Sequence, residues 1–121
     1  MIFLGKTLTK DDLPIFIYSN GQLVDPCSIT YTIFDCTTGK SEIIRQTINS
    51  KPMKFDKGCY FIPLRLNSQI FRTGRHIVQW QVKQYSDSDV QQVIKDFDII
   101  RPAHFAGEFS NAKYPNSTRA L

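Results

Sequence analysis

Two pairs of aspartates are the side chains whose spacing could bind a metal ion or transfer a proton. Asp87 and Asp89 lie in the polar segment 86–89, but two carboxylates fall short of the roughly six to eight oxygen ligands that Ca²⁺ prefers. Asp96 and Asp98 share one face of an alternating strand, and the alternation makes it the solvent-facing one. General acid–base catalysis would also need a cleft. These carboxylates therefore predict neither a metal site nor a catalytic site.

The two histidines, His76 and His104, stand apart from any serine or cysteine motif. A nucleophile needs a base within hydrogen-bonding reach, and the sequence shows no such combination. We therefore predict that the protein is not an enzyme and that it has no catalytic residues and no cofactor.

The three cysteines favour free thiols over metal binding or disulfides. Their spacing does not fit a zinc site. Cys27 and Cys36 flank the expected strand 28–35, which places them about 30 Å apart at roughly 3.3 Å per residue, too far for a disulfide. Cys59 could pair with either one and would leave an odd thiol. We expect three free, mostly buried thiols in a reducing compartment.

Composition and charge indicate one ordinary globular domain. The 121 residues are 41% hydrophobic with a net charge of +4, which suits a single core. Basic residues gather near two loops, at Lys51, Lys54 and Lys57 and at Arg72 and Arg75. They form either solvated loops or a basic rim that faces an acidic protein or a nucleic acid. We expect no direct contact with nucleic acid, because no basic run interleaves with aromatic residues.

The first residues predict neither export nor membrane insertion. Ile2, Phe3 and Leu4 are the only apolar residues after the initiator methionine, and no basic region precedes them. This stretch is too short for a signal peptide or a membrane span. We expect a protein that is made in the cytoplasm and has no membrane partner.

Period-two alternation of apolar residues is the strongest structural signal. Val78, Trp80 and Val82 fall on one face of a long strand, and polar residues fall on the other, as in a sheet packed on one side. Comparable runs predict about seven strands, at 13–18, 28–35, 42–47, 53–55, 59–64, 75–85 and 90–100. Asn20-Gly21 predicts a two-residue hairpin turn. Lys95 interrupts the last strand, which indicates a bulge or a barely covered edge.

The expected architecture is all-β, a single Greek-key β-sandwich over residues 13–100. An N-terminal arm at 1–12 precedes it, and a C-terminal extension at 101–121 follows. Phe105, Phe109 and Tyr114 recur in this extension, and aromatic side chains are costly to leave in water. The extension therefore either folds back on its own sandwich or docks on a neighbouring subunit.

Several short motifs resemble the immunoglobulin-like domains of tailed-bacteriophage virion proteins over roughly residues 13–100. The matching segments are Gln22-Leu-Val-Asp-Pro26, Ile29-Thr-Tyr-Thr-Ile-Phe-Asp35 with Thr37-Thr38-Gly39, Gly58-Cys-Tyr60 and Gly74-x-His76-x-Val-x-Trp80. The resemblance implies an immunoglobulin-like sandwich with a structural role, as capsid decoration or as part of the neck, baseplate or fibre attachment. It implies no catalytic residues.

One position departs from that pattern. The family places a tyrosine where this chain has His76, and the tyrosine hydroxyl bonds back to the preceding loop. An imidazole could donate the same kind of bond, so we interpret Gly74, His76 and Trp80 as structural residues.

Two functions follow as expectations. The first is a virion structural protein, present as a homo-oligomer or a repeated lattice copy, which contacts other capsid, neck or tail subunits through edge strands and terminal arms. Its contact residues would be Ile2, Phe3 and Leu4 together with Phe105, Phe109 and Tyr114. The alternative is a carbohydrate- or receptor-binding sandwich, marked by exposed aromatics on one sheet face. Phe16 and Tyr18 share a face, but alternation does not reveal which face is outside.

The C-terminal extension can be tested by truncation. We expect a chain without residues 103–121 to remain a folded monomer, measured by circular dichroism and light scattering, but to be lost from assembled particles. Unfolding of the truncated chain would show instead that the extension belongs to the core.

Overall fold

Strand β9 (Gly74–Lys83) is the centre of the larger sheet in the computed structural model, which describes residues 1–102. It pairs antiparallel with β5 (Ser28–Asp35) on one edge and with β10 (Gln91–Ile100) on the other. β1 (Ile2–Phe3) lies outside β10, and β6 (Glu42–Ile43) lies outside β5, which gives the order β1-β10-β9-β5-β6. The described chain is all-β, as predicted.

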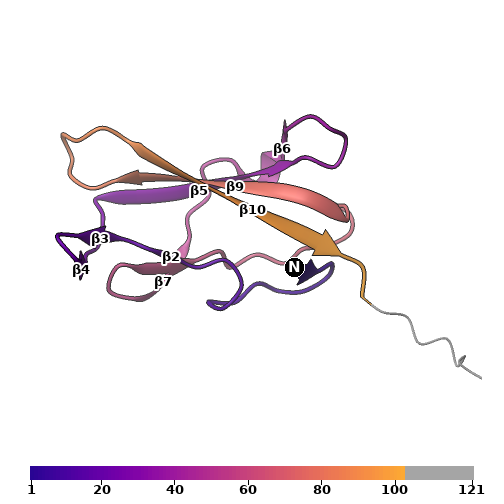
Figure 1. Cartoon of the computed structure of the whole chain (residues 1–121), viewed down its shortest axis with the longest axis horizontal. Helices are drawn as coiled ribbons and strands as arrows, with labels where there is room; N and C mark the ends of the chain where they lie inside the picture. Colours follow the sequence, from indigo (N-terminus) through magenta and orange to yellow (C-terminus); the bar gives the residue numbers. More distant parts are fainter. Residues whose placement is uncertain (103–121) are drawn as a thin grey trace, which may run out of the picture.

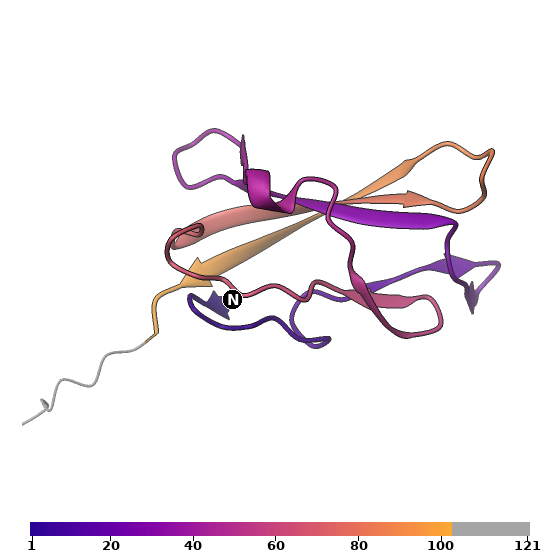
Figure 2. The ribbon, with the colours of Figure 1, turned by 180° about the vertical axis from the view of Figure 1, so that it is seen from behind.

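Smaller sheets form the second layer. β2 (Ile15–Phe16), β8 (Cys59–Phe61) and β7 (Met53–Asp56) make a three-stranded antiparallel sheet in that order. β3 (Tyr18–Ser19) and β4 (Gln22–Leu23) form a separate hairpin. Figures 1 and 2 show β5, β9 and β10 in one layer, with β2 and β7 facing them across the interior.

The core fills the space between these layers. Trp80 is 1% exposed, and its ring lies 5.7 Å from that of Tyr31 on the neighbouring strand. Full burial of an apolar side chain stabilises the fold by about 1.5–3 kcal/mol. The other apolar residues that are at most 2% exposed are Leu8, Leu13, Ile33, Ile62, Leu66, Phe71, Val78 and Ile99.

The predicted hairpin at Asn20-Gly21 is confirmed. Tyr18 pairs with Leu23 and Ser19 with Gln22, which leaves a two-residue loop. Both loop residues have positive φ, 52° at Asn20 and 76° at Gly21, as the tight hairpin turn requires.

The predicted strand at 13–18 is two short strands instead. The change occurs at Ile17, whose amide donates to the Gly58 carbonyl while its own carbonyl accepts from the Val24 amide. Before Ile17 the chain pairs with β8, as β2, and after Ile17 it pairs with β4, as β3. Alternation continues through Ile17, so the side-chain pattern does not reveal the change of partner.

The predicted return strand at 42–47 ends early, at Ile43. Residues Arg45–Thr47 form a 3-10 helix, η1. The Thr47 hydroxyl, which is buried, accepts the Ile33 amide at 2.9 Å and donates to the Ile44 carbonyl at 2.7 Å. The Thr47 hydroxyl thus takes the place of a backbone carbonyl as the acceptor for the Ile33 amide of β5. Residues Arg45–Thr47 can therefore form a helical turn instead of continuing the strand.

The N-terminal residues differ from the expected arm, because they are part of the fold. Ile2 pairs in parallel with Ile99 and is 6% exposed. The Leu4 amide donates to the Ile100 carbonyl at 2.8 Å. Leu8 is 2% exposed, and its amide donates to Leu64 at 2.8 Å. Backbone pairing and apolar burial therefore hold residues 1–12 against the domain.

The interruption at Lys95 reflects a barely covered edge. β10 pairs with β9 in unbroken register from Gln91 to Ile99, so the alternative of a bulge is wrong. Lys95 is exposed, as is Val93 on the same face of the strand. Only the later residues Phe97 and Ile99 are buried, so the second layer covers only the last part of β10.

Gly58 offers a test of the packing between β8 and the segment before β5. It has φ +71°, and an added Cβ would lie 2.9 Å from both the amide nitrogen and the carbonyl oxygen of Val24. We expect Gly58→Ala to lower the free energy of unfolding by about 2 kcal/mol or more, measured by chemical denaturation. Gly39→Ala is the matched control, because Gly39 has φ +87° with nothing within 4 Å, and its loss should be near 1 kcal/mol. Equal losses would mean that the close approach at Gly58 is not rigid.

Candidate functional site

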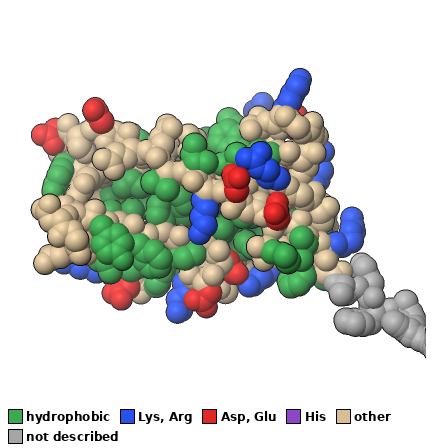
Figure 3. All heavy atoms as spheres, viewed as in Figure 1, with side chains coloured by type: hydrophobic (Ala, Val, Ile, Leu, Met, Phe, Trp, Pro, Cys, Tyr) green, Lys and Arg blue, Asp and Glu red, His purple; other side chains and the backbone are tan. Residues whose placement is uncertain are grey.

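The solvent-facing side of the β2-β8-β7 sheet carries an apolar cluster. Its members are Phe16, Met53, Phe55 and Phe61, which we call the outer patch. Phe16, Met53 and Phe55 are 49%, 52% and 37% exposed, and Phe61 is half-buried. Hydrophobic side chains gather over β2 and its neighbours in the space-filling view (Figure 3). An exposed group of large apolar side chains on one sheet face is a candidate interaction surface.

Strand pairing brings these side chains together. Phe16 lies opposite Cys59, and Met53 lies opposite Phe61. The register of β7 shifts between Lys54 and Asp56, and the contacts of the Phe55 ring with those of Phe16 and Phe61 place Phe55 on the same side. Ile15 and Tyr60, which pair with each other on the neighbouring strands, are buried on the opposite side of this sheet.

The rings of the outer patch meet edge to face. Phe16 and Phe55 are 6.4 Å apart at 79°, and Phe55 and Phe61 are 5.9 Å apart at 61°. The Lys10 ammonium lies 6.0 Å from the Phe55 ring centre, near the limit of a cation–π contact. The patch can therefore offer apolar contact area with one positive charge at its rim.

Asp25 holds the hairpin beneath the outer patch in place. Its carboxylate accepts from the Lys54 ammonium at 2.7 Å, the Gly58 amide at 2.8 Å and the Tyr60 hydroxyl at 3.1 Å. The bonds from Lys54 and Gly58 lower the pKa of Asp25 to about 2. Burial and the bond to Asp25 raise the pKa of Tyr60 to about 12. The patch thus lies on a hairpin joined to the segment before β5.

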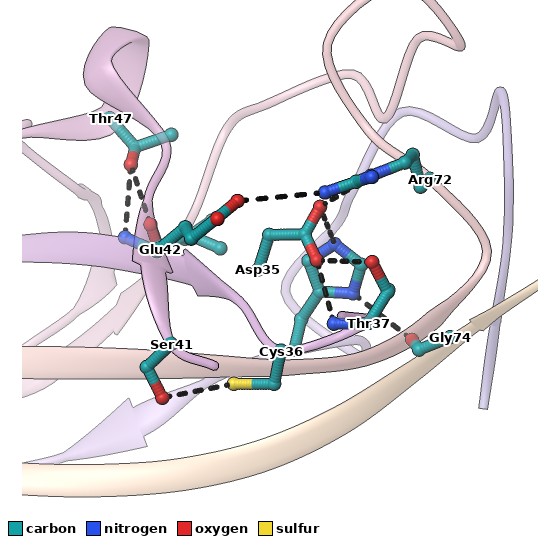
Figure 4. A network of polar contacts seen from close by, with 10 residues as sticks. Asp35, Cys36, Thr37, Ser41, Glu42, Thr47, Arg72 and Gly74 are labelled. Carbon is teal, nitrogen blue, oxygen red and sulfur yellow. Dashed lines mark hydrogen bonds and ion pairs between the residues drawn. The ribbon is translucent and has the colours of Figure 1, made fainter. Parts of the chain in front are cut away.

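A second carboxylate, Asp35, organises the opposite end of β5 (Figure 4). It is 5% exposed and accepts from the Thr37 hydroxyl at 2.6 Å, the Thr37 amide at 2.8 Å and Arg72 Nε at 3.0 Å. Burial alone would raise the pKa of this carboxyl, but the bonds from Thr37 and Arg72 outweigh it and hold the pKa below the ordinary 3.8. Arg72 also lies 3.7 Å from Glu42. Asp35 therefore joins β5 to the loop before β9.

His76 lies behind this network and is fully buried. Its Nδ1 is 3.0 Å from the Gly74 carbonyl, which can only accept, so the proton of the bond is on Nδ1. Nε2 has no hydrogen-bond partner among the described residues and lies 4.0 Å from Asp35 Oδ2. The ring stacks on Phe97 at 5.5 Å. These contacts are those of a structural side chain that bonds to the start of its own strand.

Gly74 admits this arrangement because it has no side chain. Its φ is +127°, and an added Cβ would lie 2.7 Å from the Thr37 methyl group. The sequence pointed to Gly74, His76 and Trp80 as structural residues. It did not reveal Arg72 as the partner of Asp35, because a contact across 37 positions leaves no local pattern.

The two pairs of aspartates lie on the exposed surface. Asp87, Asp89, Asp96 and Asp98 are all exposed, and Asp96 forms an ion pair with Arg75 at 3.2 Å. Among residues 1–102, no three His, Cys, Asp or Glu side chains are grouped so that they could hold a metal ion.

The two groups of basic residues, which the sequence left as either solvated loops or a basic rim, are largely paired with carboxylates. Lys54 bonds to Asp25, Arg72 to Asp35 and Arg75 to Asp96. Three of the five cations that the sequence grouped therefore hold carboxylates of the same chain.

The three thiols are free, as expected, but they differ in burial. Cys59 is buried beside the outer patch, Cys36 is half-buried and Cys27 is exposed. Burial raises the pKa of the Cys59 thiol, so this thiol is a packing group.

Of the six terminal residues expected to make contacts, the structure describes Ile2, Phe3 and Leu4. Ile2 is in the core, Leu4 is half-buried and Phe3 is 49% exposed, so Phe3 alone of the three offers a large free surface. Phe105, Phe109 and Tyr114, like His104, lie outside the described residues.

The Asp35 network predicts a pH-dependent contribution to stability. We expect Asp35→Asn to lower the free energy of unfolding by about 1–3 kcal/mol at neutral pH, because the charged bond to Arg72 is lost. The pKa of Asp35 is depressed by folding, so its contribution is present above pH 3.8 and is lost as the pH falls through the lower folded-state pKa. The two proteins should therefore converge in stability in acid. Denaturation curves at a series of pH values measure this difference.

Glu42→Gln is the control for that experiment. Glu42 is 58% exposed and lies 3.7 Å from the same Arg72, so its removal should change stability by less than about 1 kcal/mol. A difference between wild type and Asp35→Asn that stays constant into acid would contradict a role for the Asp35 charge.

Comparisons with known proteins identify no relative. No protein-family model matches the sequence, and no curated protein and no solved structure matches the chain. Among residues 1–102, no helix has the length and apolar character needed to cross a membrane. Functional inference for this chain therefore depends on its own surfaces.

Proposed function

We propose that this chain is a non-enzymatic structural protein of a tailed-phage virion, attached to the capsid or to the neck and tail lattice through its surfaces and its terminal segments. The observation that carries the proposed attachment is the outer patch, an apolar surface on a sheet whose β7–β8 hairpin Asp25 joins to the segment before β5. Its partners would be other virion proteins, and its location would be the assembled particle.

The proposed fold is an immunoglobulin-like Greek-key sandwich. In its support, β5 lies beside β9 although three strands, β6 to β8, come between them in the chain. The chain therefore crosses between layers, as Greek-key connections do. β1 also pairs in parallel with β10, so the two ends of the domain share one sheet edge.

The phage assignment comes from the motif resemblance, and the contacts explain why those motif residues are present. Asp25 joins its own turn to Gly58 and Tyr60 of the next motif. Asp35 accepts from Thr37 within its motif. The matched residues therefore maintain the fold.

The chemistry of the outer patch favours a protein partner. Its side chains offer no acid, no base and no hydrogen-bonding group, so they can contribute only apolar burial. At about 25 cal/mol per Å², such a surface adds modest affinity. In a repeated lattice, modest contacts are strengthened by multivalency.

Carbohydrate binding is the alternative, favoured by the exposure of Tyr18 (61%) beside Phe16 (49%). Stacking on a sugar uses the open face of a ring, with polar groups at its rim to bind hydroxyls. Within the outer patch the rings stand at 79° and 61° to one another and do not form a coplanar platform. A glycan array with hits that are lost in Tyr18→Ala would favour this alternative.

The virion assignment can be tested directly. A tagged copy would be expressed in cells producing the phage that carries the gene, and purified particles would be analysed by quantitative mass spectrometry. We expect a fixed number of copies per particle. A chain that is expressed and folded but absent from particles would contradict the proposal.

The outer patch can be tested in the same assay. We expect Phe16→Ser combined with Phe55→Ser to reduce incorporation about tenfold or more, because the apolar contact is removed. Stability should change by less than about 1.5 kcal/mol, since both rings are partly exposed already. Tyr85→Ser is the matched control, because Tyr85 is 61% exposed on the distant β9–β10 hairpin. Equal incorporation of all three proteins would show that the outer patch is not the contact surface.

A further inference from the structure

The outer edge of β10 has no partner strand over most of its length within residues 1–102. β1 pairs only with Ile99 and Ile100, and β9 occupies the opposite edge. The Leu4 amide donates to the Ile100 carbonyl, so the backbone groups of Ile100 point to the outer edge. Because this direction alternates along a strand, the amides and carbonyls of Gln92, Ile94 and Asp96 point outward as well.

Apolar side chains flank this free edge on both faces of the sheet. Val93 is 44% exposed on the face toward the second layer, and Ile94 is 62% exposed on the opposite face. Val90, just before the strand, is 54% exposed. A flat edge with free backbone donors and acceptors and apolar flanks is a template for another strand.

We propose that this edge pairs with the same edge of a second copy, antiparallel about a two-fold axis at Ile94. The free segment is 91–97, since β1 covers the edge from Ile99 onward. Ile94 is the midpoint of that segment, so this register pairs all of it. The backbone groups of Ile94 point outward, as a hydrogen-bonded pair on the axis requires.

The side chains suit this register better than its neighbours. Ile94 meets its own copy on one face, and on the other Val93 lies against the aliphatic stem of Lys95 from the second chain. An axis at Lys95 or at Asp96 would place like charges directly opposite each other, which destabilises a sheet. An axis at Val93 would extend past Gln91 into the hairpin loop and pair fewer residues.

The expected dimer is weak and leaves the outer patch free. One pair of short strands buries less surface than the roughly 1,200–2,000 Å² of a stable interface, so the dimer should dissociate on dilution, which is the condition under which the chain without residues 103–121 is expected to be a monomer. The outer patch belongs to the other layer, and both surfaces can be occupied together. The inference does not depend on the virion assignment.

Light scattering of the full chain over a range of concentrations is the first test. We expect a monomer–dimer equilibrium, whose dissociation constant Ile94→Lys raises about tenfold or more by placing two charges together on the axis. Ile43→Lys is the matched control, because Ile43 is 50% exposed at the opposite edge of the same sheet, and it should leave dimerisation unchanged. A monomer at every concentration, or equal weakening by both variants, would overturn the proposal.

Oxidative cross-linking tests the register itself. In a Cys27→Ser background, which removes the exposed native thiol, Ile94→Cys should form a disulfide-linked dimer, because facing Cα atoms lie about 5.5 Å apart. Val90→Cys is equally accessible, but its two copies would be about 27 Å apart, four residues from the axis on each strand at roughly 3.4 Å per residue. It should remain monomeric. Efficient cross-linking of Val90→Cys, or none at Ile94→Cys because another segment covers the edge, would overturn the proposed pairing.

Discussion

Strand β9 imposes the constraint on which the rest of the structure depends. It is paired along both edges, and its inward side chains from His76 to Val82 are at most 5% exposed. A ten-residue strand with one apolar face is stable only if another layer covers that face. Here the covering layer is built from strands of two to four residues, and buried side chains from the connecting segments, such as Leu66 and Phe71, complete it.

The short strands of the covering layer form few backbone hydrogen bonds with one another. Two carboxylates add hydrogen bonds that hold the connecting segments in place. Asp25 ties the β7–β8 hairpin to the segment before β5, and Asp35 ties the end of β5 to the loop before β9. Charged acceptors with several donors form stronger bonds than neutral pairs. Asp25 lies in the segment between β4 and β5, and Asp35 is the last residue of β5. Both aspartates therefore fix connections between strands.

Alternation predicted the long strands well, because burial on one face is a local property of the sequence. The strands at 28–35 and 91–100 and the Asn20-Gly21 turn agree with the structure. Alternation did not predict the break at Ile17, the 3-10 helix at 45–47 or the pairing of residues 2–3 with 99–100. In each of these cases a backbone group takes a partner that is remote in the chain or belongs to a side chain. The same limit applies to the outer patch, since alternation separates two faces but does not tell which one is covered.

The exposed surfaces follow from the imbalance between the two layers. Where the smaller layer ends, the first half of β10 keeps Val93 and Lys95 in solvent and its outer edge free. Nothing within residues 1–102 covers the outer side of the smaller layer, which carries Phe16 and Phe55 at the surface. Lys95 discourages indiscriminate pairing at the open edge, while its long aliphatic stem tolerates a partner that brings Val93 against it. In the proposed dimer, the charge of Lys95 and the aliphatic contact of its stem with Val93 would favour one register over its neighbours.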